Sequence, residues 1–331
     1  MFRRYHSRFL VSLCLCMTCL LLITPLFTGE SNAKSKFPSK TITYIIPTSP
    51  GGGFDVFSRL LIPYLQKYLP GKPNIIIKNI PGAGWNIGIT KLYRAKPDGH
   101  TMGIMMPANC VNQVVAKTKF DLRKMTWMGN IAESIYVGAV AKKSKYKTVE
   151  DLKKADLVVS ATVGLTTMNG LSSLVTAQTM GIKAKFLPHV GSTQAILSAL
   201  RGDADIVQFP YTTLKKSIVD SKDLIPLWSM SEKRLDVLPN VPTIVELGYP
   251  DLINMGRLIR ITGGPPGMPA DVAKIWRDAF WKATNDPEYQ KKQFALNATP
   301  HPMKHGEIEA AVAKAFEIVT KHKALIMKYR K

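Results

Sequence analysis

The stretch "PTSPGGGFD", Pro47 to Asp55, places three consecutive glycines between an apolar run and an amphipathic one. The run before it, "TITYIIP" (41–47), is typical of a strand, and "FDVFSRLLIPYLQKYL" (54–69) has apolar residues at helical spacing. Three glycines lose much conformational entropy on ordering, so this turn requires bare backbone. A strand, a glycine turn and a helix start together favour an anion site, because the first N–H groups of a helix lack partners within it.

The same alternation continues along the chain and predicts an α/β fold. Strand–helix–strand units of this length indicate mainly parallel sheets, here divided into two lobes joined near 137–142 and 256–262. We expect lobe 1 to comprise 34–139 plus 257–331, with the C-terminal helices returning to it, and lobe 2 to comprise 140–256. The expected elements are strands at 74–80, 100–107, 156–163, 183–190 and 204–210, and helices at 148–155 with Thr148 as N-cap, 167–181 ended by Gly181, and 192–203 with Ser192 as N-cap.

The first 33 residues have the pattern of a secretory signal peptide. Three arginines precede an apolar stretch, 9–22, and Ser31-Asn32-Ala33 forms a small-x-small end. A membrane anchor is the alternative, but the apolar run falls short of the about 20 residues that an anchor needs, and a proline follows it. We therefore predict export by the Sec route, cleavage after Ala33 and a periplasmic location.

Removal of this segment changes the cysteine and charge counts. Cys110 is then the only cysteine, so no intrachain disulfide can form. The chain has 45 lysines and arginines and 23 acidic residues; without three arginines and Glu30, 42 and 22 remain, a formal charge of +20. The lysines are scattered and show no aromatic interleaving, which argues against nucleic acid and favours an anionic small molecule.

Comparable turns occur in the second lobe at 163–167 and 189–193, and known catalytic or cofactor motifs do not account for them. Gly82, Gly84 and Gly88 miss the dinucleotide spacing by one residue, and the P-loop lysine is absent. The hydrolase motifs G-x-S-x-G and H-E-x-x-H are also missing. We expect no catalytic residue, no cofactor and no metal site. The remaining alternative is that the turns serve only the fold.

Several stretches taken together resemble one family of receptors. "IIPTSPGGGFDVFSRLL", "NIPGAGWNIG", "KPDGHTMGI", "LPHVGSTQAILSALRGDADI" and "RLDVLPNVPTIVELGYPD" are similar to the extracytoplasmic solute receptors of tripartite tricarboxylate transporters, the Bug receptors. The resemblance covers essentially all of the chain after the signal. It implies a type II periplasmic-binding-protein fold with a hinge, the Venus flytrap arrangement, and a monomer that captures small organic acids for membrane permease subunits without catalysis.

The resemblance also implies the residues that contact the ligand. They lie in four turns and in the segment that begins at Phe209: Thr48, Gly52, Gly53, Phe54 and Asp55; Ala83, Gly84, Trp85 and Asn86; Gly164, Leu165, Thr166 and Thr167; His189, Gly191 and Ser192; and Phe209. Asn109, just after the strand at 100–107, is a further polar candidate for ligand contact on the grounds of its own position. For Asp55 the alternative is a purely local role at the helix start.

The chain departs from the family pattern at several of these positions. Phe54 stands in place of a small hydroxyl residue, Trp85 in place of a glycine and His189 in place of a tyrosine, and Leu165 to Met168 replaces a more polar turn. These changes argue against citrate-like ligands. Our hypothesis is a mono- or dicarboxylate with an apolar or aromatic body, against which Phe54 or Trp85 packs. The alternative is that both rings point into the core.

Two other functions stay open on sequence grounds. A receptor of this kind can present its ligand to a signalling partner as a sensor or adaptor, and the sequence does not separate that role from transport. A nucleotide-dependent α/β enzyme is the third reading, and the missing motifs count against it.

Overall fold

Two strand–helix series and two long antiparallel strands build the computed structural model, which describes residues 37–165, 167–296 and 298–329. The predicted signal peptide lies outside the described residues. The strands are β1 (Ile42–Ile46), β2 (Ile75–Asn79), β3 (Thr101–Met105), β4 (Thr126–Ala141), β5 (Val158–Thr162), β6 (Ala184–Pro188), β7 (Ile206–Pro210), β8 (Leu224–Ser229) and β9 (Arg257–Gly264).

Helices follow most of these strands, as the alternating pattern predicts. They are α2 (Gly53–Tyr68), α3 (Asn86–Tyr93), α4 (Cys110–Val115), α5 (Val149–Lys154), α6 (Met168–Met180), α7 (Ser192–Arg201), α8 (Tyr211–Lys215), α9 (Ala270–Thr284), α10 (Pro287–Ala295), α11 (His305–Lys321) and α12 (Lys323–Tyr329). Short 3₁₀ turns include η1 (Pro107–Asn109) and η4 (Pro250–Met255).

The strands form two groups that share β4. The first sheet has the order β2-β1-β3-β9-β4, and in the second, β4-β7-β5-β6, strand β8 also pairs with β4. Strand β1 is parallel to β2 and β3, and β5 is parallel to β6 and β7, as expected for strand–helix–strand units. Strands β4, β8 and β9 add antiparallel pairs, so each sheet is mixed.

The sequence pattern predicts no strand at residues 126–141, where β4 runs for 16 residues. Nearly every position of β4 is buried, because it pairs with β9 in the first sheet and with β7 and β8 in the second. A strand buried on both faces lacks the alternation that identifies a strand in a sequence. Polar residues within it, such as Asn130 and Glu133, weaken the apolar signal further.

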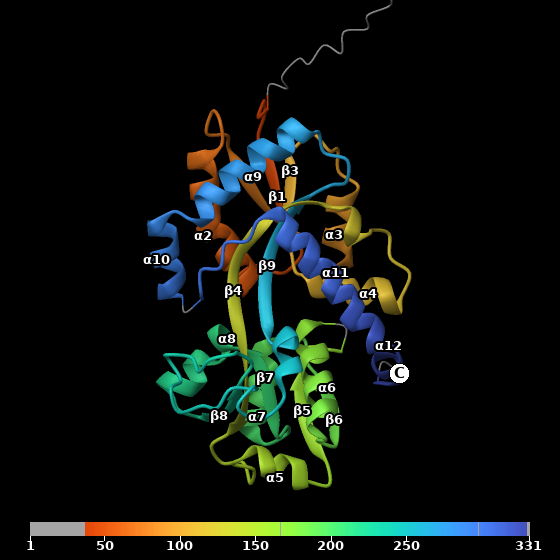
Figure 1. Ribbon diagram of the computed structural model, residues 1–331, viewed down its shortest axis with the longest axis vertical. Coiled ribbons are helices and arrows are strands. Elements are labelled where there is room, and N and C mark those ends of the chain that lie inside the picture. Colours follow the sequence, from red (N-terminus) through yellow and green to blue (C-terminus); the bar gives the residue numbers. More distant parts are fainter. Residues whose placement is uncertain (1–36, 166, 297, 330–331) are drawn as a thin grey trace, which may run out of the picture. The chain divides into compact units, whose positions relative to one another are not determined.

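Helices cover both faces of the first sheet (Figure 1). Helices α2, α9 and α10 pack together on one side, over a core that includes Tyr44, Leu61, Trp276 and Phe280. Helix α11 packs against β4, η1 and α4 on the other side. The C-terminal helices thus pack against elements of the first sheet.

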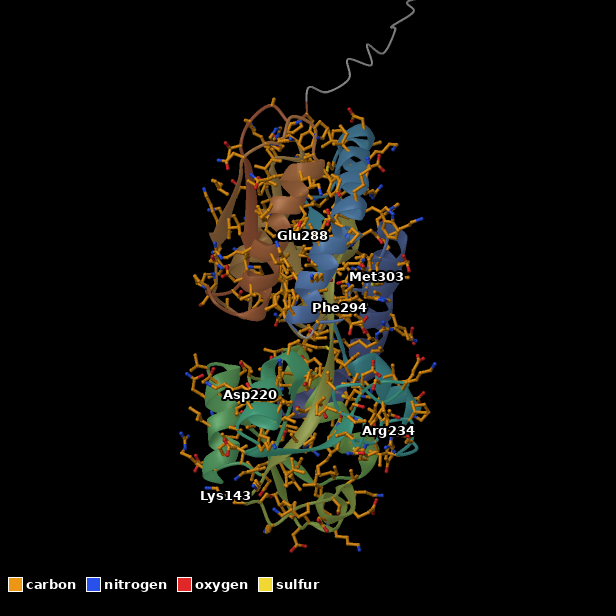
Figure 2. The ribbon with its side chains drawn as sticks, turned by 90° about the vertical axis from the view of Figure 1, so that its left-hand side faces the viewer. Lys143, Asp220, Arg234, Glu288, Phe294 and Met303 are labelled. Atoms are coloured by element: carbon orange, nitrogen blue, oxygen red, sulfur yellow. The ribbon has the colours of Figure 1, made fainter. Side chains whose placement is uncertain are left out.

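Helix α10 shows how sequence pattern determines which side faces the core. Tyr289 and Gln293 are buried, and the Tyr289 hydroxyl donates to the carbonyl of Ile131 in β4 at 3.3 Å. Phe294 is 63% exposed and points away from that core, as does Glu288 (Figure 2). The buried Tyr289 thus brings a polar side chain close to the strands β4 and β9.

Local predictions of helix ends mostly agree with the structure. The Thr148 side chain accepts from the amide of Asp151 and caps α5, and Gly181 ends α6 in the left-handed conformation. The prediction for Ser192 is wrong, because Gly191 is the N-cap of α7 and Ser192 is its first helical residue. A glycine N-cap offers no side chain to the first amides of the helix, which bears directly on the site.

Candidate functional site

The first glycine turn joins β1 to α2, and the Asp55 carboxylate holds its backbone through hydrogen bonds. Asp55 Oδ2 accepts from the amide of Gly51 at 3.0 Å and from Arg59 Nε at 2.9 Å. Its Oδ1 accepts from Asn79 Nδ2 at 3.0 Å, and the same Asn79 nitrogen donates to the carbonyl of Thr48. The carboxylate and Asn79 therefore hold both ends of the turn in one conformation.

The environment of Asp55 favours its charged form. The hydrogen bond from Arg59, supported by those from Gly51 and Asn79, lowers the pKa of Asp55 to about 2, against the opposing effect of burial. Its oxygens are thus already engaged within the chain. The structure gives Asp55 the local role at the helix start, now with a defined function in shaping the turn.

The first amides of α2 are left without partners. Gly52 is the N-cap and provides no side chain, and Gly51, Gly52 and Gly53 are exposed. Among the described residues, nothing accepts a hydrogen bond from the amides of Gly52, Gly53 and Phe54. Free amides at the positive end of a helix dipole have the chemistry that favours an anion, which makes this turn a candidate site.

The second turn, 81–88, has an unusual backbone. Gly82, Ala83, Gly84 and Trp85 have φ values of 125°, 47°, 59° and 78°, all in the left-handed region. Ala83 and Trp85 are strained there, since side chains rarely adopt such values. Asn112 Nδ2 supports this turn by donating to the carbonyl of Gly84 and to Asn86 Oδ1, both at 3.3 Å.

The rings of Phe54 and Trp85 meet across the two turns. Their centroids are 4.5 Å apart at an interplanar angle of 83°, an edge-to-face contact. Both residues are half-buried and pack against the core while part of each side chain stays accessible. The structure therefore brings the two aromatic residues together beside the uncapped start of α2.

The turns of the second sheet differ in how many amides they leave free. After β5, Thr167 caps α6 by accepting from the amide of Gly170, and Asn169 Oδ1 accepts from the amide of Val163 at 2.7 Å. The amide of Gly164 donates to a neighbouring hydroxyl, and Leu165 is half-buried. Thr166 lies outside the described residues. The backbone of this turn is thus largely satisfied.

The turn after β6 resembles the first turn more closely. Gly191 is the N-cap of α7 without a side-chain bond, and the described residues contain no acceptor for the amides of Ser192 and Thr193. His189 anchors the turn through its amide, which donates to the carbonyl of Thr162 at 2.8 Å. His189 Nε2 is buried without a hydrogen-bond partner in the described chain.

Two predicted site residues have local roles in the fold. Asn109 is buried, and its Oδ1 accepts from the amide of Met106 at 2.9 Å, which closes η1. Phe209 is 3% exposed and packs in the core of the second sheet with Val137 and Val207. Both side chains are held by neighbours within the chain. Cys110, which follows Asn109, is a buried thiol whose pKa burial raises to about 12.

Arg260 is a functional candidate that the sequence analysis missed. It lies in the middle of β9 and is 2% exposed, with Nη1 donating to Ser134 Oγ at 3.0 Å. Its Nη2 lies 3.5 Å from the position that a Cβ on Gly53 would occupy, so the guanidinium reaches the first glycine turn. An arginine within the apolar run "LIRITGG" is the signal that should have identified it.

Comparison with known proteins identifies the family of the chain. The profile of the tripartite tricarboxylate transporter family receptor, TctC, matches residues 59–329. The chain belongs to this receptor family. It is 26% identical over 253 residues to BugT of Bordetella pertussis, a match that covers 72% of this chain and 76% of BugT. Receptors of the TctC family are periplasmic solute-binding proteins and not enzymes.

Solved structures show the same fold. A periplasmic transporter structure is 25% identical, covers 87% of this chain and 97% of its own, and gives a TM-score of 0.76. The fold is shared by a Rhodopseudomonas palustris protein with adipate, which is 20% identical, covers 86% of this chain and 97% of its own, and gives a TM-score of 0.75. It is also shared by MatC of that organism with bound malate, which is 20% identical, covers 86% of this chain and 99% of its own, and gives a TM-score of 0.73. The predicted type II periplasmic-binding-protein fold is confirmed.

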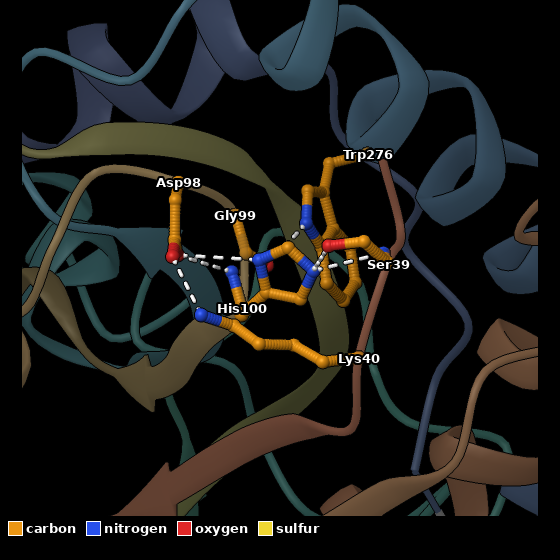
Figure 3. A network of polar contacts seen from close by, with 6 residues as sticks. All are labelled: Ser39, Lys40, Asp98, Gly99, His100 and Trp276. Carbon is orange, nitrogen blue, oxygen red and sulfur yellow. Dashed lines mark hydrogen bonds and ion pairs between the residues drawn. The ribbon is translucent and has the colours of Figure 1, made fainter. Parts of the chain in front are cut away.

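One polar cluster of this TctC receptor has the residue types of a hydrolase but not the arrangement. Asp98 Oδ1 lies 3.3 Å from His100 Nδ1, and Ser39 Oγ lies 3.5 Å from His100 Nε2 (Figure 3). The backbone N–H of Ser39 donates to that same Nε2 at 3.1 Å, so the nitrogen is already occupied as an acceptor. Lys40 Nζ pairs with Asp98 at 3.1 Å. The cluster joins the start of the described chain to the turn before β3.

Three further findings concern the described part of the receptor. A cavity of about 170 Å³ lies beneath α11, lined mostly by apolar residues such as Met168 and Ile259 and also by Arg257, His301 and Lys314. None of the glycine turns contributes to its lining. Within the described ranges, no group of three or more acidic, histidine or cysteine side chains is placed to hold a metal ion. The helices of these ranges include none with the length and hydropathy needed to span a membrane.

Proposed function

We propose that this receptor captures a small organic acid, a mono- or dicarboxylate with an apolar or aromatic body, through the first amides of α2 and α7. The observation that carries the proposal is that both helices begin at a glycine N-cap and lack a side-chain cap. Each start can therefore donate backbone N–H groups to a carboxylate. Two or three such bonds to a charged group contribute about 3–9 kcal/mol before association costs.

The aromatic pair supports the second part of the proposal. Phe54 follows directly on the free amide of Gly53, and its ring contacts Trp85 from the second turn. A carboxylate bound at the start of α2 would place its carbon body near these rings. The adipate of one structural neighbour is a dicarboxylate with an apolar chain, which suits this surface, whereas the malate of the other is a small hydroxy acid.

We further propose that the protein is exported with cleavage after Ala33, acts as a monomer and delivers its ligand to the membrane permease subunits of a tripartite transporter. The two lobes, residues 34–139 with 257–331 and residues 140–256, would close on the acid. Strands β4 and β9 support this division, because the backbone passes between the two sheets at these points.

The first experiment measures binding to a defined panel. The exported protein is titrated by calorimetry with succinate, malate, adipate, citrate, benzoate and phenylacetate, each beside its neutral amide. We expect micromolar binding of at least one acid with an apolar or aromatic body, and weak binding of citrate and of the amides. Preference for malate would contradict the apolar part of the proposal, and failure to bind any of the acids would contradict the whole.

A single backbone substitution tests the role of the amides. Gly53 is the first residue of α2, where proline is accepted because its missing N–H has no helical partner. Gly52 before it has φ −78° and ψ 168°, a conformation that proline tolerates in the preceding residue. We expect Gly53→Pro to weaken acid binding roughly 10- to 100-fold, and Gly53→Ala, which keeps the N–H, to have little effect. Equal affinity of the two variants would contradict the proposal.

A further inference from the structure

Arg260 differs from the other buried charged residues of the described chain. Asp55 pairs with Arg59 at 2.9 Å, Glu133 with Arg257 at 2.6 Å and Asp286 with Lys67 at 2.8 Å. In the same ranges, no carboxylate lies within ion-pair distance of Arg260, although only 2% of the residue is exposed. A cation buried without a counter-charge is costly, and proteins normally avoid it.

The contacts of Arg260 compensate its burial only in part. One nitrogen, Nη1, donates to Ser134 Oγ, whereas Nε is buried with no partner among the described residues. The guanidinium carbon lies 4.4 Å from the Phe57 ring centroid and 5.5 Å from that of Phe54. Cation–π contacts of this kind stabilise the charge less than a carboxylate does. Burial lowers the pKa of Arg260 to about 10, so the side chain remains a cation at neutral pH.

The position of Arg260 connects it to the candidate ligand site. Its Nη2 is next to Gly53, whose amide is free, and its Ser134 partner lies 3.4 Å from Thr212 Oγ1 in α8. Helix α2 follows β1 of the first sheet, and α8 follows β7 of the second sheet. The cation therefore lies where elements of both sheets meet, directly beside the uncapped helix start.

We propose that Arg260 is a ligand-binding residue that supplies the counter-charge for one carboxylate of the acid held at the start of α2. This inference rests on the proposed function. A carboxylate at that point accepts from the amides of Gly53 and Phe54 on one side and from the Arg260 guanidinium on the other. The carboxylate supplies the negative charge that Arg260 lacks. Because the site is largely removed from water, the attraction between the two charges is stronger there than in solution. The site then selects an ionised acid over its amide by charge as well as by shape.

The test compares wild type, Arg260→Met and Arg260→Lys for an acid and its neutral amide. Adipate with adipamide and benzoate with benzamide are titrated by calorimetry. Arg201→Met, at an exposed arginine, serves as the control for loss of one positive charge. We expect Arg260→Met to lower acid affinity at least 30-fold and leave the weak amide affinity unchanged. Arg260→Lys should recover part of the loss, and Arg201→Met should match wild type.

A measurement without ligand separates this role from a structural one. Removing an unpaired buried cation should leave the thermal midpoint of ligand-free Arg260→Met equal to or above that of wild type. A fall in that midpoint, an equal loss for acid and amide, or unchanged acid affinity would each overturn the inference while leaving the proposed function in place. If wild type binds neither acid nor any other member of the panel, the inference and the proposed function fail together.

Discussion

Individual side chains in this receptor fix the conformation of the backbone turns that we propose as the ligand site. Asp55 and Asn79 hold the first turn through Gly51 and Thr48, and so leave the next amides exposed. Asn112 has the corresponding position beneath the second turn. The polar side chains at the turns therefore act largely through the conformation that they impose on the backbone.

At the residue scale, Asp55→Asn tests this role through its pH dependence. The folded pKa of Asp55, about 2, is below its ordinary value of 3.8, so its stabilising effect is full above pH 4 and is lost as the pH falls through 2. We expect the variant to be less stable at pH 7 by about 1–2 kcal/mol, a figure reduced because Arg59 is half exposed. Urea unfolding at pH 7 and near pH 2 measures it. A difference that persists unchanged at pH 2 would contradict the ionic role.

At the scale of elements, the helix starts are fixed by close backbone packing as well as by caps. Gly88 in α3 approaches β1 and the end of β2 so closely that a Cβ would lie 2.7 Å from the carbonyl oxygen of Ile80 and 2.8 Å from Pro47 Cβ. This explains the last glycine of "PGAGWNIG" as a packing requirement.

Gly88→Ala should therefore destabilise the protein by about 1–3 kcal/mol, because backbone and a proline ring cannot move aside readily. The matched control is Gly306→Ala in α11, where a Cβ would meet no atom within 4 Å, so no loss is expected. Chemical denaturation of both variants measures the difference. Similar stability of the two variants would show that α3 shifts without cost.

The pairing of β4 with β9 contains an ion pair with unequal partners. Glu133 is 5% exposed and Arg257 40%, and two hydrogen bonds of 2.6 and 2.9 Å join them. Arg257→Met leaves a buried carboxylate with only His301 beside it, whose Nδ1 lies 3.7 Å from Glu133 Oε2, whereas Glu133→Gln leaves an arginine that water can reach. We expect losses of about 2–4 and 1–2 kcal/mol, respectively, in unfolding free energy. The reverse order would mean that water reaches Glu133 freely.

Features that depend on residues close together in the sequence could be predicted, whereas features that depend on which distant strands pair could not. The glycine turns, the Thr148 cap and the alternation of strands and helices depend on neighbouring residues. Strand β4 is buried by partners from both sheets, and Arg260 meets Gly53 only because β9 lies in the first sheet. The buried roles of Asn109 and Phe209 likewise depend on packing that spacing alone does not reveal.

At the scale of the whole molecule, the receptor combines a strongly basic chain with two exposed helix starts. Its formal charge of +22 over the full sequence favours encounter with anionic solutes. The lysines are scattered along the chain, and in our proposal the specific contacts come from a few amides and one buried arginine. General attraction and specific binding are thus assigned to different residues.

Export predicts a defined mature chain. Cleavage after Ala33 should give a protein that begins at Lys34 and retains Cys110 as its single thiol. Intact mass spectrometry and N-terminal sequencing of protein from the periplasmic fraction check this, with thiol labelling after denaturation. A mass that includes residues 1–33 in the membrane fraction would contradict cleavage and support an anchor.

The most direct test of the account is a crystal structure of the exported protein with the acid that binds most tightly in calorimetry. We predict one carboxylate within hydrogen-bond distance of the amides of Gly53 and Phe54, with the Arg260 guanidinium on its other side. An acid bound in the cavity beneath α11, or anywhere that leaves the starts of α2 and α7 without contact, would contradict it.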